Sequence, residues 1–224
     1  MKPGEVVIHL LDPDAISAEN AFAILNEVER RRAERFRSES DGLRWSSFRA
    51  QMRIILGRAL NLAPLEVPLI FSEFGKPLLA PPYDGLHFNL SHCADLGLIG
   101  LCLDGPIGVD IEPQGRDSDL SECESIFCHP LEIQKLPENG LERAKRLLEI
   151  WTAKEALLKA LGTGLMHHPE SVQVSLANGT GTATSDTIVQ GIADFRIKQL
   201  DHQRLMKYRT MVAVPHSVRF VRIQ

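Results

Sequence analysis

The order of apolar segments along the 224-residue chain constrains its fold more than any other feature. Segments typical of strands come in runs, and segments with helical spacing of apolar residues lie between those runs. A parallel sheet would instead need a helix between each pair of successive strands. The order therefore favours an α+β fold, in which helices pack on small, mostly antiparallel sheets.

Two long helices have clear predicted limits. One spans residues 43–60 and is closed by Asn61, and the other spans residues 141–161 and stops at Gly162. A shorter helix begins at Ser17, with Asn20 in the capping-box position, and continues through residue 28. Further short helices are predicted at residues 120–127 and 130–136. Strands are predicted at residues 6–10, 69–71, 86–90, 96–103, 107–111, 172–176, 195–198, 210–214 and 218–223.

Two other segments predict turns. Asp104-Gly105 is a typical hairpin dipeptide, so a hairpin is expected between the strands on either side of it. Residues 176–190 are rich in Gly, Thr and Ser, and they are expected to form a loop or the tip of a hairpin.

Composition indicates an ordinary globular protein, with 44% hydrophobic and 24% charged residues. No apolar run approaches the roughly 18–20 residues that span a bilayer, and residues 1–11 do not resemble a secretion signal. We therefore expect a cytoplasmic protein without a membrane partner. The four cysteines form no CxxC pair, which favours reduced thiols.

The charge distribution favours a small anionic ligand. The formal net charge of −4 argues against a general nucleic-acid binder. Residues 29–58 nevertheless contain nine arginines, no lysine and only four acidic residues. This local excess of positive charge on an acidic chain suggests a phosphorylated ligand.

An acidic pair lies on the predicted strand at residues 108–112. Side chains alternate along a strand, so Asp110 and Glu112 share one face, and Val109 and Ile111 share the other. Two carboxylates on one face provide the oxygen ligands that magnesium prefers. Taken alone, such a pair is more typical of a solvated strand face.

The helix at residues 141–161 carries a second polar group. At 100° per residue, Thr152, Glu155 and Lys159 form one polar stripe. Lys154 is anomalous because it falls in the apolar arc of the helix, where a lysine must reach past its neighbours to solvent or find an anion. Glu155 and Lys159 alone are also compatible with an ordinary surface ion pair.

Four motifs follow one another along the chain: Phe74–Pro77 (FGKP), Phe88–His92 (FNLSH), Gly108–Glu112 (GVDIE) and Trp151–Lys159 (WTAKEALLK). Read together, they resemble the signatures of the 4'-phosphopantetheinyl transferase superfamily, in its larger, surfactin-synthetase-activating class. The similarity covers residues 30–165. Four motifs in the right order are far more specific than any single one.

The resemblance implies an architecture. It predicts two similar subdomains related by a pseudo-twofold axis, each with helices on a small sheet. Residues 1–104 would form the N-terminal, nucleotide-contacting subdomain, and residues 105–224 would carry the magnesium and catalytic residues. Coenzyme A would lie between them. A monomer is implied, because the smaller bacterial holo-synthases obtain the same site by trimerising half-length chains.

The resemblance also implies an activity. The enzyme would transfer the 4'-phosphopantetheine moiety of coenzyme A to a serine of an apo acyl or peptidyl carrier protein, releasing 3',5'-ADP. Such carriers serve fatty-acid, polyketide or nonribosomal-peptide synthesis. Two alternatives remain open: a metal-dependent phosphohydrolase that activates water with the same carboxylates, and a non-catalytic coenzyme A-binding module.

By the same resemblance, Asp110, Glu112 and Glu155 ligate Mg²⁺. Glu155 is also the candidate base for the carrier serine, and Lys159 stabilises the diphosphate and the departing 3',5'-ADP.

Four further residues are implied contacts of coenzyme A: Arg44, Lys76, Ser91 and His92. Ser91 and His92 do not form a nucleophile–base pair, because neighbours on an extended chain face opposite ways. Arg49 and Arg53 are expected only to decorate the helix that carries Arg44.

Overall fold

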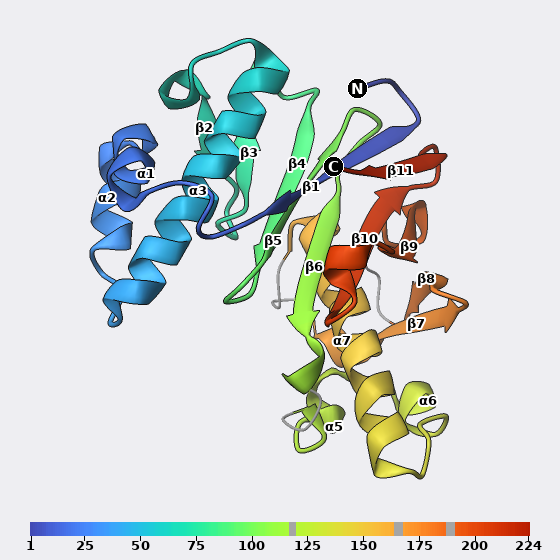
Figure 1. The fold of residues 1–224 in the computed structure, drawn as a ribbon. Coiled ribbons are helices and arrows are strands. Elements are labelled where there is room, and N and C mark those ends of the chain that lie inside the picture. Colours follow the sequence, from blue (N-terminus) through green and yellow to red (C-terminus); the bar gives the residue numbers. More distant parts are fainter. Residues whose placement is uncertain (117–119, 164–167, 187–190) are drawn as a thin grey trace.

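Two mostly antiparallel sheets form the framework of the fold, as Figure 1 shows. The structure is a computed structural model that describes residues 1–116, 120–163, 168–186 and 191–224. The first sheet has the strand order β11-β1-β5-β4, with β1 (Glu5–Leu11), β4 (His87–His92), β5 (Gly97–Cys102) and β11 (Phe220–Ile223). The second has the order β6-β10-β9-β8-β7, with β6 (Gly108–Pro113), β7 (Val172–Ala177), β8 (Thr180–Ser185), β9 (Phe195–Gln199) and β10 (Tyr208–Pro215). A small hairpin joins β2 (Leu69–Phe71) and β3 (Pro77–Leu79).

In each half of the chain one strand, β1 or β6, is followed by helices and then by a run of strands, which confirms the α+β class. The N-terminal half contains α1 (Ala18–Ile24), α2 (Glu27–Ala33) and α3 (Glu39–Leu60). The C-terminal half contains α5 (Glu124–Phe127), α6 (Pro130–Ile133) and α7 (Gly140–Leu161). Within the described residues, no helix combines the length and apolar character that crossing a membrane requires.

Capping residues set the limits of these helices. Asn61 and Gly162 adopt the left-handed conformation after α3 and α7, with φ of 58° and 79°, so the predicted ends are confirmed. Ser17 caps α1 as predicted, and its side chain accepts a hydrogen bond from the Asn20 N–H. The single helix expected over residues 17–28 is wrong, because Asn26 and Glu29 form a capping box that begins a new helix, α2.

The predicted hairpin at Asp104-Gly105 is wrong. β5 lies in the first sheet and β6 in the second, so the turn carries the chain from one sheet to the other. Gly105 has a φ of 144°, and the Asp104 carboxylate accepts a hydrogen bond from the Gly4 N–H, which ties the turn to the start of β1. The expected hairpin tip in residues 176–190 is confirmed at Asn178-Gly179, where both residues have positive φ, although the residues that follow form β8.

The helices and sheets pack as four layers. α3 covers one face of the first sheet, with Phe48, Met52 and Leu56 packed against β4 and β5. α7 covers one face of the second sheet, and the inner faces of the two sheets share a core. That core joins residues of β1 and β5 to residues of β6 and β10: Val6, Ile8, Leu98, Val109, Val212 and Val214.

The two sheets also meet edge to edge where β4 lies beside β6. The Asn89 side chain on β4 accepts a hydrogen bond from the Val109 N–H on β6, at 2.8 Å. The last strand, β11, returns to pair in parallel with β1. The chain passes from the first sheet to the second at residues 104 and 105, while β11 belongs to the first sheet. The division into subdomains at residues 1–104 and 105–224 stays a prediction. A pseudo-twofold relation between the halves stays a prediction.

Candidate active site

A glycine allows strand β6 to approach helix α7 closely. A Cβ atom on Gly108 would lie 1.9 Å from the Ala156 carbonyl oxygen and 2.5 Å from the Ala160 nitrogen. Any other residue would push the strand and helix apart. Val109 and Ile111 face the core between the sheets, so Asp110 and Glu112 face α7, the helix that carries Glu155 and Lys159.

Asp110 is the centre of the polar contacts at this junction. Asp110 is only 3% exposed to solvent. The Oδ1 atom accepts hydrogen bonds from the Lys159 Nζ at 2.6 Å and from the Ser91 hydroxyl at 2.9 Å. Lys159 also donates to the Ser91 oxygen at 3.0 Å. The structure thus brings together three predicted site residues from β4, β6 and α7.

The other oxygen of Asp110 has no hydrogen-bond partner among the described residues. This oxygen, Oδ2, is buried. A buried, unsatisfied carboxylate oxygen costs about 1–3 kcal/mol or more, so it needs a functional explanation. A hard divalent cation such as Mg²⁺ is a suitable partner for such an atom, because it takes oxygen ligands.

The remaining predicted magnesium ligands lie on either side. Glu112 is half-buried on the same face of β6 as Asp110, and its Oε1 accepts a hydrogen bond from the Trp151 indole N–H at 3.1 Å. Glu155 is half-buried on α7. In the described part of the chain, no group of three or more His, Cys, Asp or Glu side chains is arranged to hold a metal ion. The convergence of all three carboxylates therefore stays a prediction.

His92 and Arg44 extend the site towards α3. The His92 ring stacks on Phe48, with ring centroids 4.7 Å apart. Loss of solvent around the ring and the positive charges of Lys159 and Arg44 lower the His92 pKa below its ordinary value of 6.5. Arg44 forms an ion pair with Asp41 one turn before it on α3. His92 therefore lies close to two cations, each of which also pairs with a carboxylate.

Lys76 does not point into open space. Its ammonium donates hydrogen bonds to the carbonyls of Ile107, Lys159 and Ala160, two of which belong to the last turn of α7. The carbonyls of Lys159 and Ala160 have no partner within the helix, so Lys76 acts as a C-terminal cap. Burial lowers the pKa of Lys76 to about 8. Its predicted contact with a phosphate stays a prediction.

Two adjoining cavities lie beside Lys76. One, of about 190 Å³, is lined by Phe74, Lys76, Asn89 and Lys159 among others. The second, of about 430 Å³, shares Phe74 and Lys76 and extends to Thr163, whose buried hydroxyl has no hydrogen-bond partner in the part of the chain that the structure describes. Residues 74–77, together with Phe88 and Asn89 of the second motif, therefore line a space next to Lys159.

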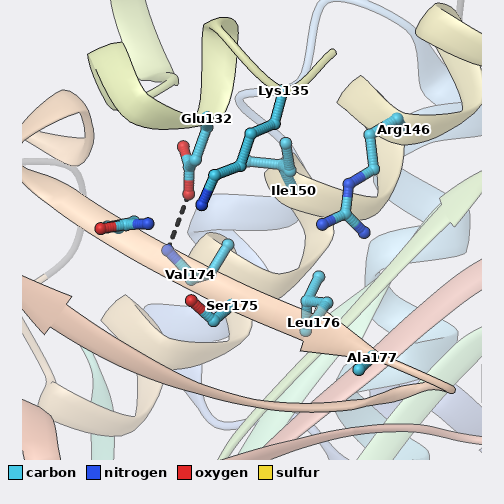
Figure 2. Close-up of a pocket in the computed structure, with 9 residues that line it drawn as sticks. Glu132, Lys135, Arg146, Ile150, Val174, Ser175, Leu176 and Ala177 are labelled. Atoms are coloured by element: carbon cyan, nitrogen blue, oxygen red, sulfur yellow. Dashed lines mark hydrogen bonds between the residues drawn. The ribbon is translucent and has the colours of Figure 1, made fainter. Parts of the chain in front are cut away.

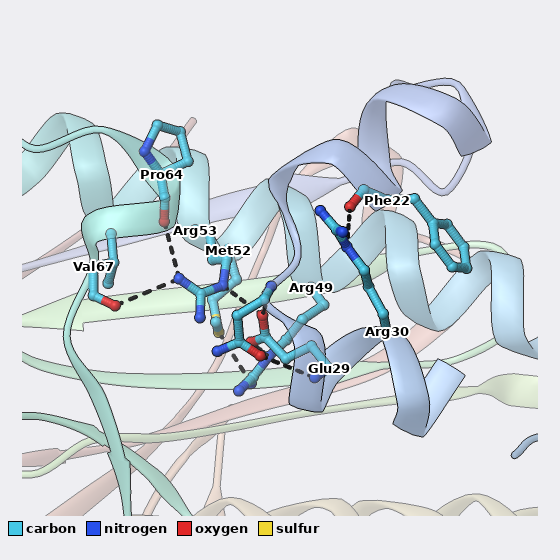
Figure 3. A network of polar contacts seen from close by, with 9 residues as sticks. Phe22, Glu29, Arg30, Arg49, Met52, Arg53, Pro64 and Val67 are labelled. Carbon is cyan, nitrogen blue, oxygen red and sulfur yellow. Dashed lines mark hydrogen bonds and ion pairs between the residues drawn. The ribbon is translucent and has the colours of Figure 1, made fainter. Parts of the chain in front are cut away.

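Arg49 and Arg53 do not decorate the helix surface, and that prediction is wrong. Both are buried, and both form ion pairs with Glu29, at 2.6 and 2.7 Å (Figure 3). Arg53 also donates to the carbonyls of Pro64 and Val67. Burial alone would raise the pKa of Glu29, but hydrogen bonds and charge from Arg53 and Arg49 lower it below its ordinary value. The cluster locks α2 onto α3 and is unavailable to a ligand.

The anomalous Lys154 finds an anion. It is only 1% exposed, and its ammonium contacts the Glu132 carboxylate at 2.7 Å and the carbonyls of Phe127 and Pro169. Burial lowers the pKa of Lys154, and the charge of Glu132 opposes that shift. Lys154 therefore ties α7 to α6 from the side opposite the candidate site.

The candidate site thus brings Asp110, Lys159 and Ser91 together where the two sheets meet. Comparison with known proteins identifies the family of the chain. Residues 106–212 match the family model for the 4'-phosphopantetheinyl transferase superfamily. The 4'-phosphopantetheinyl transferase HetI of Nostoc sp. is 33% identical over 74% of this chain and 71% of its own. A phosphopantetheinyl transferase of Thraustochytrium sp. is 30% identical over 86% of this chain and 70% of its own. The chain belongs to the 4'-phosphopantetheinyl transferase superfamily.

A further relative shows the extent of the match. The Synechocystis sp. protein slr0495 is 35% identical over 64% of this chain, and the aligned part spans 59% of that relative's length.

Proposed function

We propose that this chain transfers the 4'-phosphopantetheine moiety of coenzyme A to a serine of an apo acyl or peptidyl carrier protein, releasing 3',5'-ADP. The names of its relatives support this activity. The single structural observation that carries it is the buried Asp110 carboxylate. One of its oxygens contacts Lys159 and Ser91, and the other has no hydrogen-bond partner within residues 1–116, 120–163, 168–186 and 191–224.

Asp110, Glu112 and Glu155 would hold Mg²⁺, which when bound neutralises negative charge on the diphosphate of coenzyme A. The free Oδ2 atom of Asp110 and the shared strand face of Asp110 and Glu112 support this assignment. Glu155, on the facing helix, would supply the third carboxylate.

The side chains around this centre have separate tasks. Lys159 would stabilise charge on the diphosphate and on the departing 3',5'-ADP, and its contact with Asp110 holds its ammonium in position. Glu155 would accept the proton of the carrier serine as its oxygen attacks the β-phosphorus of coenzyme A and the bond to the leaving phosphate breaks. Both residues lie on the same stripe of α7, four positions apart, so their functional groups can reach a single reacting phosphate.

The residues towards α3 and β2–β3 would bind the rest of the nucleotide. Arg44, Ser91 and His92 would contact phosphate groups, and the positive neighbourhood around His92 supports this. Lys76 would join them if its ammonium exchanged one carbonyl for a phosphate oxygen. We propose a cytoplasmic monomer that meets coenzyme A and the carrier without nucleic acid or membrane, and sedimentation at the mass of one chain would check the oligomeric state.

The decisive experiment incubates the protein with coenzyme A, Mg²⁺ and a panel of apo-carrier proteins, and then weighs the carriers by mass spectrometry. A gain of one phosphopantetheine arm on a carrier is expected, and a carrier with its serine changed to alanine is the control. Free phosphopantetheine without carrier modification would instead indicate a phosphohydrolase. Binding of coenzyme A without any product would indicate a non-catalytic module.

A further inference from the structure

A separate pocket lies on the side of α7 that faces away from the candidate active site. It has a volume of about 250 Å³ and lies between α6, α7 and the edge strand β7 (Figure 2). Ile150 forms part of its wall. Ile150 and Lys159 are nine residues apart on one helix, which places them on opposite faces and about 13 Å apart along its axis. An occupant of this pocket would not reach the transferred group.

The backbone of β7 is partly open at this pocket. β7 ends the order of the second sheet, and only β8 pairs with it in the described part of the chain. The Val174 N–H points away from β8, because it donates to the Glu132 carboxylate at 2.7 Å. Backbone groups two residues apart point the same way along a strand. The N–H and C=O of Leu176 therefore also face the pocket, and no described residue pairs with them.

The pocket also carries positive charge. The negative charge of Glu132 is balanced by Lys154. Its carboxylate also accepts hydrogen bonds from the N–H groups of His129 and Val174. Figure 2 shows Lys135 and Arg146 extending towards β7 from opposite sides of the space. Arg146 forms an ion pair with Glu149, whereas Lys135 is exposed and forms no ion pair with any described residue.

We propose that this pocket binds an extended acidic segment of a partner protein. One residue of that segment would pair with the N–H and C=O of Leu176 as an added strand, and an acidic side chain would lie beside Lys135 and Arg146. Strand addition suits an edge with unpaired backbone groups, and the two cations supply the preference for acidic side chains. The Glu132 carboxylate occupies the Val174 N–H, so the paired stretch is short and ends there.

The test uses the full-length ¹⁵N-labelled protein and a synthetic probe, an acetylated and amidated six-residue peptide that alternates valine and glutamate. We expect a saturable shift of the Leu176 amide resonance in an NMR titration up to millimolar peptide. Two matched peptides are the controls. One carries glutamine in place of glutamate, and the other is N-methylated so that it cannot donate to the Leu176 carbonyl. Both should bind at least tenfold more weakly.

Charge reversal on the protein separates this pocket from general attraction to a basic surface. Lys135→Glu should weaken the glutamate peptide at least tenfold. Lys145→Glu is the control, since Lys145 is an exposed lysine on α7 that pairs with Glu142 outside the pocket, and it should change the affinity less than twofold. Absence of a Leu176 shift, equal binding of either control peptide, or equal effects of the two variants would overturn the proposal.

Discussion

The two oxygens of Asp110 have different surroundings, and this difference makes the residue the most sensitive position of the site. Oδ1 accepts hydrogen bonds from Lys159 and Ser91, while no described residue pairs with the buried Oδ2. A neutral amide could keep one contact with Ser91 but would offer neither the charge that attracts a cation nor the charge that holds Lys159. If the proposed function is right, activity should depend on the negative charge of Asp110 rather than on the shape of its side chain.

Asp110→Asn should therefore lower the rate of carrier modification by about 10²–10³-fold or more, the loss typical of removing one preorganised electrostatic contact. Excess Mg²⁺ should restore little of that rate. The mass-spectrometric assay measures the effect, and Asp201→Asn, which changes an exposed carboxylate, is the control. Activity of Asp110→Asn near that of the wild type would remove the residue from the catalytic assignment.

Lys76 gives a second prediction at the residue scale, which concerns pH. Its pKa is about 8 in the folded chain, against an ordinary value of 10.5. Between those values the unfolded chain binds more protons than the folded chain, so the contribution of Lys76 to the free energy of unfolding rises with pH across that interval. Lys76→Met should lack this rise. Urea denaturation from pH 7.5 to 10.5 measures the difference, and parallel curves for the two proteins would contradict the assignment.

At the scale of elements, the contact between β6 and α7 builds the site. Gly108 leaves room for the backbone of α7, and that approach sets how far Asp110 lies from Lys159. Lys76 then closes the last turn of the same helix. Close packing against α7 therefore requires the glycine that begins the GVDIE motif. This packing positions the two acids that follow it.

Gly108→Ala should separate the strand from the helix, because the added methyl group would meet backbone atoms of Ala156 and Ala160 that cannot rotate away. Overpacking of this kind costs about 1–3 kcal/mol in the free energy of unfolding. Carrier modification should fall as well, even in conditions where the variant is fully folded. Gly140→Ala is the matched control on α7, since open space surrounds that position, and its stability should be unchanged or raised by up to ~1 kcal/mol.

Elements were predictable from sequence where local chemistry decides them. Asn61 and Gly162 end their helices through their own backbone preferences, so both ends could be foreseen. Asn26 broke a predicted helix because its capping box with Glu29 competes with helical periodicity, which apolar spacing alone does not reveal. Asp104-Gly105 looks like a hairpin locally, but the strands beside it pair with distant segments, and that choice is made by the whole sheet.

The candidate site shows the same limit. The motifs led to Ser91, Asp110 and Lys159, which the structure brings into contact. The partners of other charged residues were hidden because they are remote in sequence. Glu29 lies 20 and 24 residues from the two arginines with which it forms ion pairs. The helix end that Lys76 caps is more than 80 residues from Lys76. Residue type shows that a buried charge needs a partner, but only the fold selects which one.

At the scale of the whole molecule, the two halves of the chain are joined by more than a linker. The sheets share a core that contains Val6 and Ile8 from the first sheet and Val109 and Val212 from the second. β11, from the end of the described chain, pairs with β1 near its beginning. Neither sheet could lose its partner without exposing this apolar face to water, which would be unfavourable.

The protein should consequently unfold as one cooperative unit, and its two tryptophans can test this. Trp45 lies on α3 in the N-terminal half, and Trp151 lies on α7 in the C-terminal half. Trp151→Phe leaves fluorescence from the first, and Trp45→Phe leaves fluorescence from the second. In each variant the urea midpoint from fluorescence should equal the midpoint from far-ultraviolet circular dichroism, as two-state unfolding requires. Because each variant supplies both signals, a change in overall stability caused by the substitution does not affect the comparison. Separate midpoints would show that the halves unfold independently. The shared core would then contribute little to holding the acids of β6 in place relative to Ser91 and Arg44.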